Sequence, residues 1–407
     1  MGTGGGRWRC SLAILAVLAL SAGCTTAAVT ETAPEGAWAD QVISLGAVYS
    51  TTGAGAAYGP QSIDGAKLAA KEINANGGVR GAKVTLTFRN DNSVPATSAT
   101  ATADLIEQDR ALALLGPSLT NTAAAAHTTA DSHRTVMMAT SNTGQGIVGD
   151  CTFPCTWIFR DSLGEATAIP ANIASYARSS HPSSAAILYP STGDVLGQQQ
   201  AGIAQTAMAP NHIDLQADIG YPTDGSSLAG AVTQALAAHP QVLFIAGSSA
   251  TNLIKLIQTA HAQGFLGQIL GGNTFNSTPV ARGVGLAGNG AQSAAAWFEG
   301  NAFPANTKFV ADYENTYHEV PDQFAAQAYT GVQLLANAAA EAPLTFTNLA
   351  ADRHRMLTAL EGVSMQTPLG PFSFTTSHDV EQPIWIVAMN GQGGYTLITS
   401  ELASPAL

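Results

Sequence analysis

The stretch from Gly46 to Gly81 constrains the fold of this chain more than any other part of its sequence. It reads GAVYSTTGAGAAYGPQSIDGAKLAAKEINANGGVRG: the end of an apolar run, a glycine-rich loop, and apolar residues that recur at helical spacing. Pro60 near the start of the helical pattern and Gly77-Gly78 at its end are typical of helix boundaries. The apolar runs 42–48 and 84–88 predict strands on either side. We therefore expect a strand–helix–strand unit of a parallel sheet.

Strand and helix patterns keep alternating along the rest of the chain. Thr120 is expected to cap a helix that runs through Ala130, and 253–262 is expected to be another helix. The apolar runs that predict further strands are 111–115, 135–139, 185–189, 242–246, 268–271, 294–298 and 384–389. The chain is therefore predicted to be α/β throughout, and it is long enough for two lobes with separate cores.

The N-terminus has the features of an export signal. Arg7 and Arg9 precede the apolar run 12–20, which is too short to span a bilayer as a helix. The ending LSAGC resembles a bacterial lipoprotein signal, so we expect a signal peptide over 1–23 and a lipidated Cys24. Ordinary secretion is the alternative. Residues 24–40 are small, polar and proline-bearing, which predicts a flexible tether.

Charge and cysteine content narrow the classes of function. The formal net charge is −12, and removing the signal takes away two arginines and no acids, so the mature chain is more acidic still. An acidic chain without basic clusters is a poor nucleic-acid binder. Cys151 and Cys155 remain after the signal, and their spacing permits a small disulfide loop in an oxidising compartment. We expect no metal site, because no histidine or second cysteine pair lies at ligand spacing.

A nucleotide site is the rival interpretation of the opening loop. Gly53-Ala54-Gly55 resembles half of a dinucleotide fingerprint, but Tyr58 occupies the place of the third glycine and Asp91 comes late for the ribose acid. A glycine loop that only turns the chain is the simpler alternative. Nucleophile-elbow, phosphate-loop and zinc-protease motifs are absent, so we expect no enzyme and no cofactor. Asp194 and Asp224 are interpreted as solvated turn aspartates.

Five segments together carry a more specific resemblance. TTGAGAAYG, GAKLAAKEINANGGVRG, LLGPSLTNT, ATSNT and PLGPFSF are similar to segments of type I periplasmic binding proteins of the branched-chain amino-acid (Leu/Ile/Val-binding) family of ABC importers, over roughly 42–398. The resemblance implies two Rossmann-like lobes with central parallel sheets. Three crossings near Asp161, Gly300 and Pro368 would join them, with the ligand held between the lobes.

The family layout also implies lobe boundaries and partners. The first lobe would comprise 41–161 plus 300–368, and the second 162–299 plus 369–400. The expected partners are a small solute and a permease–ATPase complex in the membrane, with the chain itself a monomer. A ligand-sensing receptor of the same fold is the alternative, because a fold alone does not fix function.

The resemblance assigns four residues of the first lobe to the ligand. Thr120 matches the position whose hydroxyl and amide hold a ligand carboxylate, at a helix start that favours anions. Ser141 and Thr143 match a strand-end pair that offers a carbonyl and a hydroxyl, and Tyr58 matches an aromatic at the cleft mouth. All four follow strands, where open parallel sheets bind ligands. The alternative is that Thr120 and Thr143 are only cap and turn residues.

The second lobe departs from the family pattern. Asn273 stands where family members that bind α-amino acids usually carry an acid, while Leu196 and Ser248 stand where aromatics are usual. Phe275 and Tyr329 are candidates to compensate for the lost aromatics. An amide lacks the charge of a carboxylate. The hypothesis is therefore that carboxylate capture is retained and ammonium capture weakened, which admits amides, urea-like compounds and small carboxylic acids.

Overall fold

Two largely parallel sheets form the framework of the computed structural model, which describes residues 1–2, 37–151 and 153–401. Residues 3–23 of the predicted signal peptide, Cys24, and the predicted tether up to residue 36 lie outside the described residues. In the first sheet all strands are parallel and follow the spatial order β2-β1-β3-β4-β5. Its strands are β1 (Val42–Val48), β2 (Lys83–Arg89), β3 (Ala113–Leu115), β4 (Met137–Ala139) and β5 (Ile158–Arg160).

The second sheet follows the order β15-β14-β10-β9-β8-β6-β7. Strands β6 to β10 are parallel to their neighbours within that group, whereas β14 runs antiparallel to both β10 and β15. Its strands are β6 (Ser184–Pro190), β7 (Asp214–Tyr221), β8 (Val242–Ile245), β9 (Gln268–Gly271), β10 (Gln292–Ala295), β14 (Ile384–Met389) and β15 (Tyr395–Glu401). The predicted α/β fold with two Rossmann-like lobes is confirmed, with an antiparallel addition to the second sheet.

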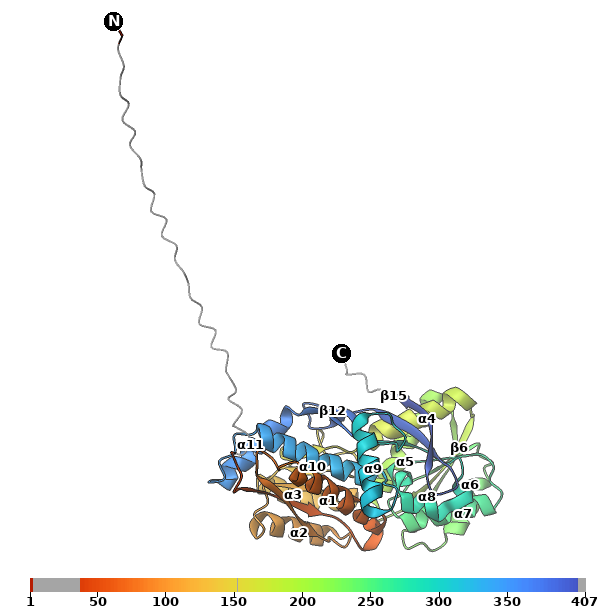
Figure 1. The fold of residues 1–407 in the computed structure, drawn as a ribbon. Coiled ribbons are helices and arrows are strands. Elements are labelled where there is room, and N and C mark those ends of the chain that lie inside the picture. Colours follow the sequence, from red (N-terminus) through yellow and green to blue (C-terminus); the bar gives the residue numbers. More distant parts are fainter. Residues whose placement is uncertain (3–36, 152, 402–407) are drawn as a thin grey trace. The chain divides into compact units, whose positions relative to one another are not determined.

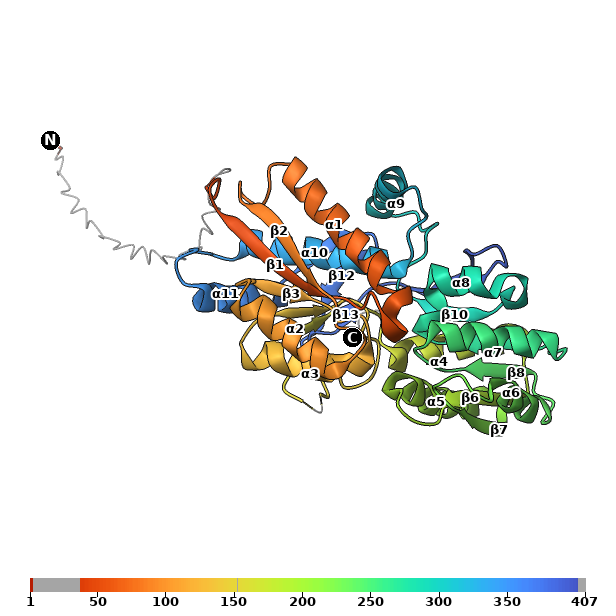
Figure 2. The same cartoon turned by 90° about the horizontal axis from the view of Figure 1, so that it is seen from below.

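Helices accompany both sheets (Figures 1 and 2). The first three helices are α1 (Gly59–Ala75), α2 (Pro95–Glu107) and α3 (Thr120–Ser132), and each follows a strand of the first sheet. The later ones are α4 (Glu165–Ser180), α5 (Val195–Met208), α6 (Leu228–Leu236), α7 (Ala250–Ala262), α8 (Thr278–Val284), α9 (Pro304–Tyr317), α10 (Gln323–Glu341) and α11 (Leu349–Glu361). A search of the described helices finds none long and apolar enough to cross a membrane.

The opening stretch forms the predicted strand–helix–strand unit. Between β1 and α1 the glycine-rich loop adopts a short 3-10 helix, η1 (Gly53–Ala57), and Pro60 lies in the first turn of α1. The helix ends where Gly77 and Gly78 take φ angles of +93° and +77°, which residues with a Cβ rarely adopt. β2 then pairs with β1 along its whole length.

Two local predictions were wrong. The strand predicted over 294–298 runs from Gln292 to Ala295, because the Ala296 N–H leaves the ladder and donates to Gln323 Oε1 at 3.1 Å. Thr120 does not cap α3: the cap position is Leu119, no side chain caps the helix, and Thr120 is its first residue.

The chain passes between the two sheets three times. It leaves β5 at Arg160 and enters the second sheet through α4, returns after β10 through α9 and α10, and reaches β14 through a small antiparallel sheet. That third sheet consists of β11 (Ser364–Thr367), β12 (Gly370–Phe374) and β13 (Val380–Glu381). Phe374 packs edge-on against Phe159 of β5, with ring centroids 5.0 Å apart. The residue boundaries of the two lobes stay a prediction.

The contact between α1 and α10 gives a direct test of this packing. A Cβ added at Gly65 of α1 would overlap the backbone carbonyl of Ala325 in α10, whereas a Cβ added at Gly202 of α5 would meet nothing within 4 Å. Overpacking of this kind typically costs 1–3 kcal/mol, so Gly65→Ala should lower the free energy of unfolding by about 2 kcal/mol.

Gly202→Ala is the matched control, since alanine favours the helix by up to about 1 kcal/mol without a clash. Both variants are to be compared with the parent chain by urea unfolding. Equal stability of the two variants would contradict the close approach of α1 and α10.

Candidate functional site

The loops after β3 and β4 bring the predicted first-lobe residues together. Thr120 Oγ1 accepts a hydrogen bond from the Gly144 N–H at 3.3 Å. Ser141 donates its hydroxyl to the Ser118 carbonyl at 2.8 Å, so this hydroxyl ties the two loops to each other. Thr143 donates to Glu165 Oε1 at 3.2 Å. All three predicted side chains are buried, at the carboxyl ends of adjacent strands as expected.

The predicted second-lobe residues contact first-lobe residues directly. Leu196 donates its backbone N–H to Asn121 Oδ1 at 3.2 Å. The Ser248 hydroxyl oxygen lies 3.3 Å from Asn121 Nδ2 and accepts from it. Asn273 donates its N–H to Glu165 Oε1 at 3.0 Å, and its side-chain Oδ1 accepts from Gln323. The structure therefore brings residues from both sheets into one buried, hydrogen-bonded group.

Tyr58 lies inside this contact. Its side chain is 2% exposed and packs on Phe324, with ring centroids 4.8 Å apart. The hydroxyl donates to the Ser248 carbonyl at 2.8 Å. Burial raises the pKa of Tyr58, which keeps the phenol neutral and able to donate. Tyr58 is thus a buried link between the loop before α1 and the loop after β8.

Asn121 and Asp194 were missed or misread from the sequence. Asp194, interpreted as a solvated turn residue, is 5% exposed and caps α5. Its carboxylate accepts from the Gly197 N–H at 3.1 Å, the Ser248 N–H at 2.7 Å and Asn121 Nδ2 at 3.2 Å. Asp224, by contrast, is exposed as predicted. The only signal for Asn121 in the sequence is its place directly after Thr120.

Glu165 is the other residue that sequence reasoning missed. It is fully buried at the start of α4, and its Oε1 accepts from Thr143, Gln200 and Asn273. Its Oε2 has no hydrogen-bond partner among the described residues. Burial raises the pKa of this carboxyl, an effect that the three hydrogen bonds and the charge of Arg160 oppose.

The two aromatic residues considered as replacements lie elsewhere. Phe275 is fully buried and belongs to the same hydrophobic cluster as Tyr221 and Phe324. Tyr329 belongs to the first core and donates its hydroxyl to Glu72 Oε2 at 2.9 Å. Within the described residues, neither the Phe275 nor the Tyr329 side chain forms a hydrogen bond or an aromatic ring contact with the predicted ligand residues.

A surface hollow lies beside the buried group. It has a volume of about 460 Å³. On its wall, the Gln145 N–H donates a hydrogen bond to Gln199 Oε1 at 3.0 Å. Its lining residues are Gln145, Ala166, Pro170, Gln199, Gly202, Ile203, Thr206 and Ala207. Ala166, the residue after Glu165, is part of this lining, whereas Glu165 itself is not.

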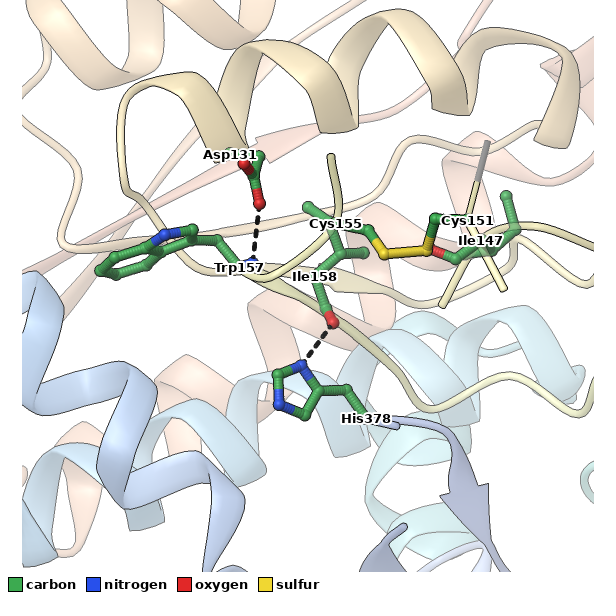
Figure 3. Close-up of a disulfide and its surroundings, with 7 residues drawn as sticks. All are labelled: Asp131, Ile147, Cys151, Cys155, Trp157, Ile158 and His378. Carbon is green, nitrogen blue, oxygen red and sulfur yellow. Dashed lines mark hydrogen bonds between the residues drawn. A yellow bond between two sulfur atoms is a disulfide. The ribbon is translucent and has the colours of Figure 1, made fainter. Parts of the chain in front are cut away.

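A disulfide fixes the loop that leads from Thr143 to β5. Cys151 and Cys155 are joined, as Figure 3 shows. On the β5 side of the disulfide, the Trp157 N–H donates to Asp131 Oδ1 at 3.0 Å, and His378 Nδ1 donates to the Ile158 carbonyl at 3.1 Å. His378 also stacks on Phe159 at 4.0 Å. The loop is thereby tied at its end to α3 and to the third sheet.

Comparison with known proteins gives a consistent result. A family model described as periplasmic binding protein matches residues 42–394. Among curated proteins, an amino acid binding protein of Pseudomonas aeruginosa is 39% identical over 80 residues, which is 20% of this chain and 21% of that protein. The matched stretch therefore spans about a fifth of the relative's length.

Two solved structures are similar over most of their length. The branched-chain amino acid transporter substrate binding protein LivJ of Streptococcus pneumoniae, in complex with isoleucine, has a TM-score of 0.78 at 22% identity and covers 90% of this chain and 100% of its own. An ABC transporter solute binding protein of R. palustris, in complex with benzoate, has a TM-score of 0.77 at 18% identity and covers 90% and 97%.

Asp194 offers a test of the hydrogen-bonded group. Asp194→Ala removes a helix cap and leaves the buried Ser248 N–H unpaired, so we expect the free energy of unfolding to fall by about 2–3 kcal/mol. Asp224→Ala is the control, because this exposed residue accepts only from Ser226 and should change stability by less than about 0.5 kcal/mol. Similar urea midpoints for the two variants would refute the bridging role of Asp194.

Proposed function

This chain belongs to the periplasmic binding protein family, and we propose that it is the extracytoplasmic substrate-binding protein of an ABC importer, which captures a small polar solute without altering it. The observation that carries the proposal is the meeting of Thr143 from the first sheet with Glu165 and Asn273 from the second. A solute bound there contacts both lobes at once, which is what a closing receptor requires.

We propose lobe closure as the mechanism. In the structure, hydrogen bonds from Tyr58 to Ser248 and between Asn121 and Asp194 join the two sides. These bonds must break when the lobes separate, and a solute held by both sides stabilises the closed arrangement only through contacts that the open one lacks. The proposed hinge lies at the three crossings, with lobes of 41–161 plus 300–368 and 162–299 plus 369–400.

The proposed solute carries a carboxylate or an equivalent polar group. Support comes from α3, whose N-terminus has no side-chain cap and begins at Thr120, so its N–H groups and helix dipole favour an anion. The isoleucine of the LivJ complex and the benzoate of the R. palustris complex both carry carboxylates. The proposed class comprises amino acids, amides, urea-like compounds and small carboxylic acids, held by Tyr58, Thr120, Ser141, Thr143, Leu196, Ser248 and Asn273.

The proposed location is the outer face of the cell membrane, with Cys24 lipidated and 24–40 as a tether. The disulfide between Cys151 and Cys155 supports an oxidising compartment. The proposed partners are a permease and an ATPase, with the receptor a monomer. A sensor of the same fold is the alternative, and a permease and an ATPase encoded beside this chain would favour delivery to a transporter over sensing.

A thermal-shift panel tests the proposed capture of a solute. The mature chain is to be melted with leucine, isoleucine, benzoate, small amides and urea. At least one compound should raise the melting temperature with rising concentration, since a ligand at 100 times its Kd adds about 2.7 kcal/mol of stability.

Thr120→Val keeps the side-chain shape and removes the hydroxyl, and should weaken binding of the active compound about tenfold. Thr129→Val on the same helix is the control, because that hydroxyl bonds only the Ala125 carbonyl. If no compound shifts the melting temperature, or the two variants weaken binding equally, the proposed site is wrong.

Cys24→Ser tests the proposed anchor. Without the thiol no lipid can be attached, so the full-length variant expressed in a bacterium should move from the membrane fraction to the soluble fraction. Cys10→Ser, within the predicted signal peptide, is the control and should leave the distribution unchanged. Immunoblotting of the two fractions measures the distribution. Equal amounts of both variants in the membrane fraction would contradict lipidation at Cys24.

A further inference from the structure

Glu165 has an unusual environment for a side chain with no assigned role. It is fully buried, and its Oε1 accepts three hydrogen bonds: from Thr143 at 3.2 Å, from Gln200 at 2.6 Å and from the Asn273 N–H at 3.0 Å. These donors come from the loop after β4, from α5 and from the loop after β9. A single carboxylate oxygen is therefore held by elements that belong to both sheets.

The second oxygen of the Glu165 carboxylate, Oε2, takes no part in these hydrogen bonds. Oε2 is buried and has no hydrogen-bond partner among the described residues. An ionised carboxylate in such surroundings is costly unless a cation or a donor faces it. A proton on Oε2, a bound water, or a positively charged group from outside the chain would each satisfy this oxygen.

Arg160 does not supply the missing partner. Its Nε and Nη2 donate to Asp379 at 2.8 and 2.5 Å, and its Nη1 donates to the Gly144 carbonyl at 3.1 Å. The guanidinium therefore influences Glu165 only through space. The remaining neighbours on α5 and on the loops after β4 and β9 are neutral: Gln200, Thr143 and Asn273.

We propose that Glu165 is the anionic group of the ligand site, and that the captured solute presents a positively charged nitrogen to Oε2 while its carboxylate lies toward Thr120. This inference rests on the proposed function and narrows the solute class to compounds that carry both charges. Asn273 then has a different task from the one its position suggested: its backbone N–H orients the glutamate. The charge that residue 273 lacks is supplied from the start of α4.

The arrangement couples binding to a proton. Burial raises the pKa of Glu165, so the empty site holds the carboxyl in its neutral form more readily than an exposed glutamate would. A cationic solute must displace that proton from Oε2. Below the raised pKa, affinity for the cationic solute should therefore fall about tenfold for each pH unit, and above that pKa it should level off.

Matched pairs of ligands isolate the proposed contact. Leucine and 4-methylpentanoate, alanine and propionate, and phenylalanine and 3-phenylpropionate differ within each pair only by the amino group. The mature chain should bind one of the amino acids at least tenfold more tightly than its partner in calorimetric titrations over a series from about pH 4 to 8. Affinity for that amino acid should rise with pH until the raised pKa of Glu165 is passed, and then level off.

Glu165→Gln should weaken binding of that amino acid about 100-fold, because it removes the charge that faces a buried cation, while binding of the corresponding acid changes by less than about threefold. Glu72→Gln is the matched control. Glu72 also has one buried oxygen without a partner among the described residues, but its other oxygen bonds Lys308 and Tyr329, away from this group. Its variant should leave both affinities within about twofold.

The possible results distinguish a failure of the proposed solute class from a failure of the proposed role of Glu165. If the unaltered chain binds none of the six compounds, the solute class proposed for the site is wrong and the role of Glu165 falls with it. If each amino acid binds no better than its partner acid, or Glu165→Gln weakens both members of a pair equally, solute capture stands but Glu165 only holds the loops in place. Retained binding of the acid by Glu165→Gln shows that the variant is folded, and the pH dependence of the unaltered chain is independent of any variant.

Discussion

The hydrogen bonds to Glu165 Oε1 are the contact on which the rest of the site depends. Three donors reach this one atom from positions 143, 200 and 273. Gln200 extends the arrangement, because its own Oε1 accepts from the Gly247 N–H at 2.8 Å and so places the loop that carries Ser248. The carboxylate therefore fixes the relative positions of the loops after β4, β8 and β9.

The first and second sheets contribute to this centre in different ways. From the first sheet come a helix start without a side-chain cap at Thr120 and the hydroxyl of Thr143. From the second come the buried acids Glu165 and Asp194, each accepting several N–H groups. A solute with a carboxylate and an ammonium fits this division of charge, since each end meets a group of opposite character.

Much of the framework could be predicted from the sequence. The period of apolar residues located most strands, and because parallel strands end at a common edge, Thr120 and Thr143 could be expected to lie close together. That Asn273 of the second sheet belongs to the same site followed only from the family resemblance. Glu165, Asn121 and Asp194 could not be found this way. Glu165 meets its partners 22, 35 and 108 residues away, and no local spacing encodes such contacts. The strand predicted over 294–298 ends at Ala295 for the same reason. The Ala296 N–H donates to Gln323, which lies on a helix far along the chain.

A crystal structure of the mature chain with its tightest-binding amino acid tests the central claim most directly. We predict that the carboxylate of the amino acid lies at the start of α3 beside Thr120, with its nitrogen within hydrogen-bond distance of Glu165 Oε2. Electron density for the amino acid elsewhere, such as the hollow lined by Asp40 and Arg110 at the opposite edge of the first sheet, would contradict the account. A nitrogen that points away from Glu165 would contradict it equally.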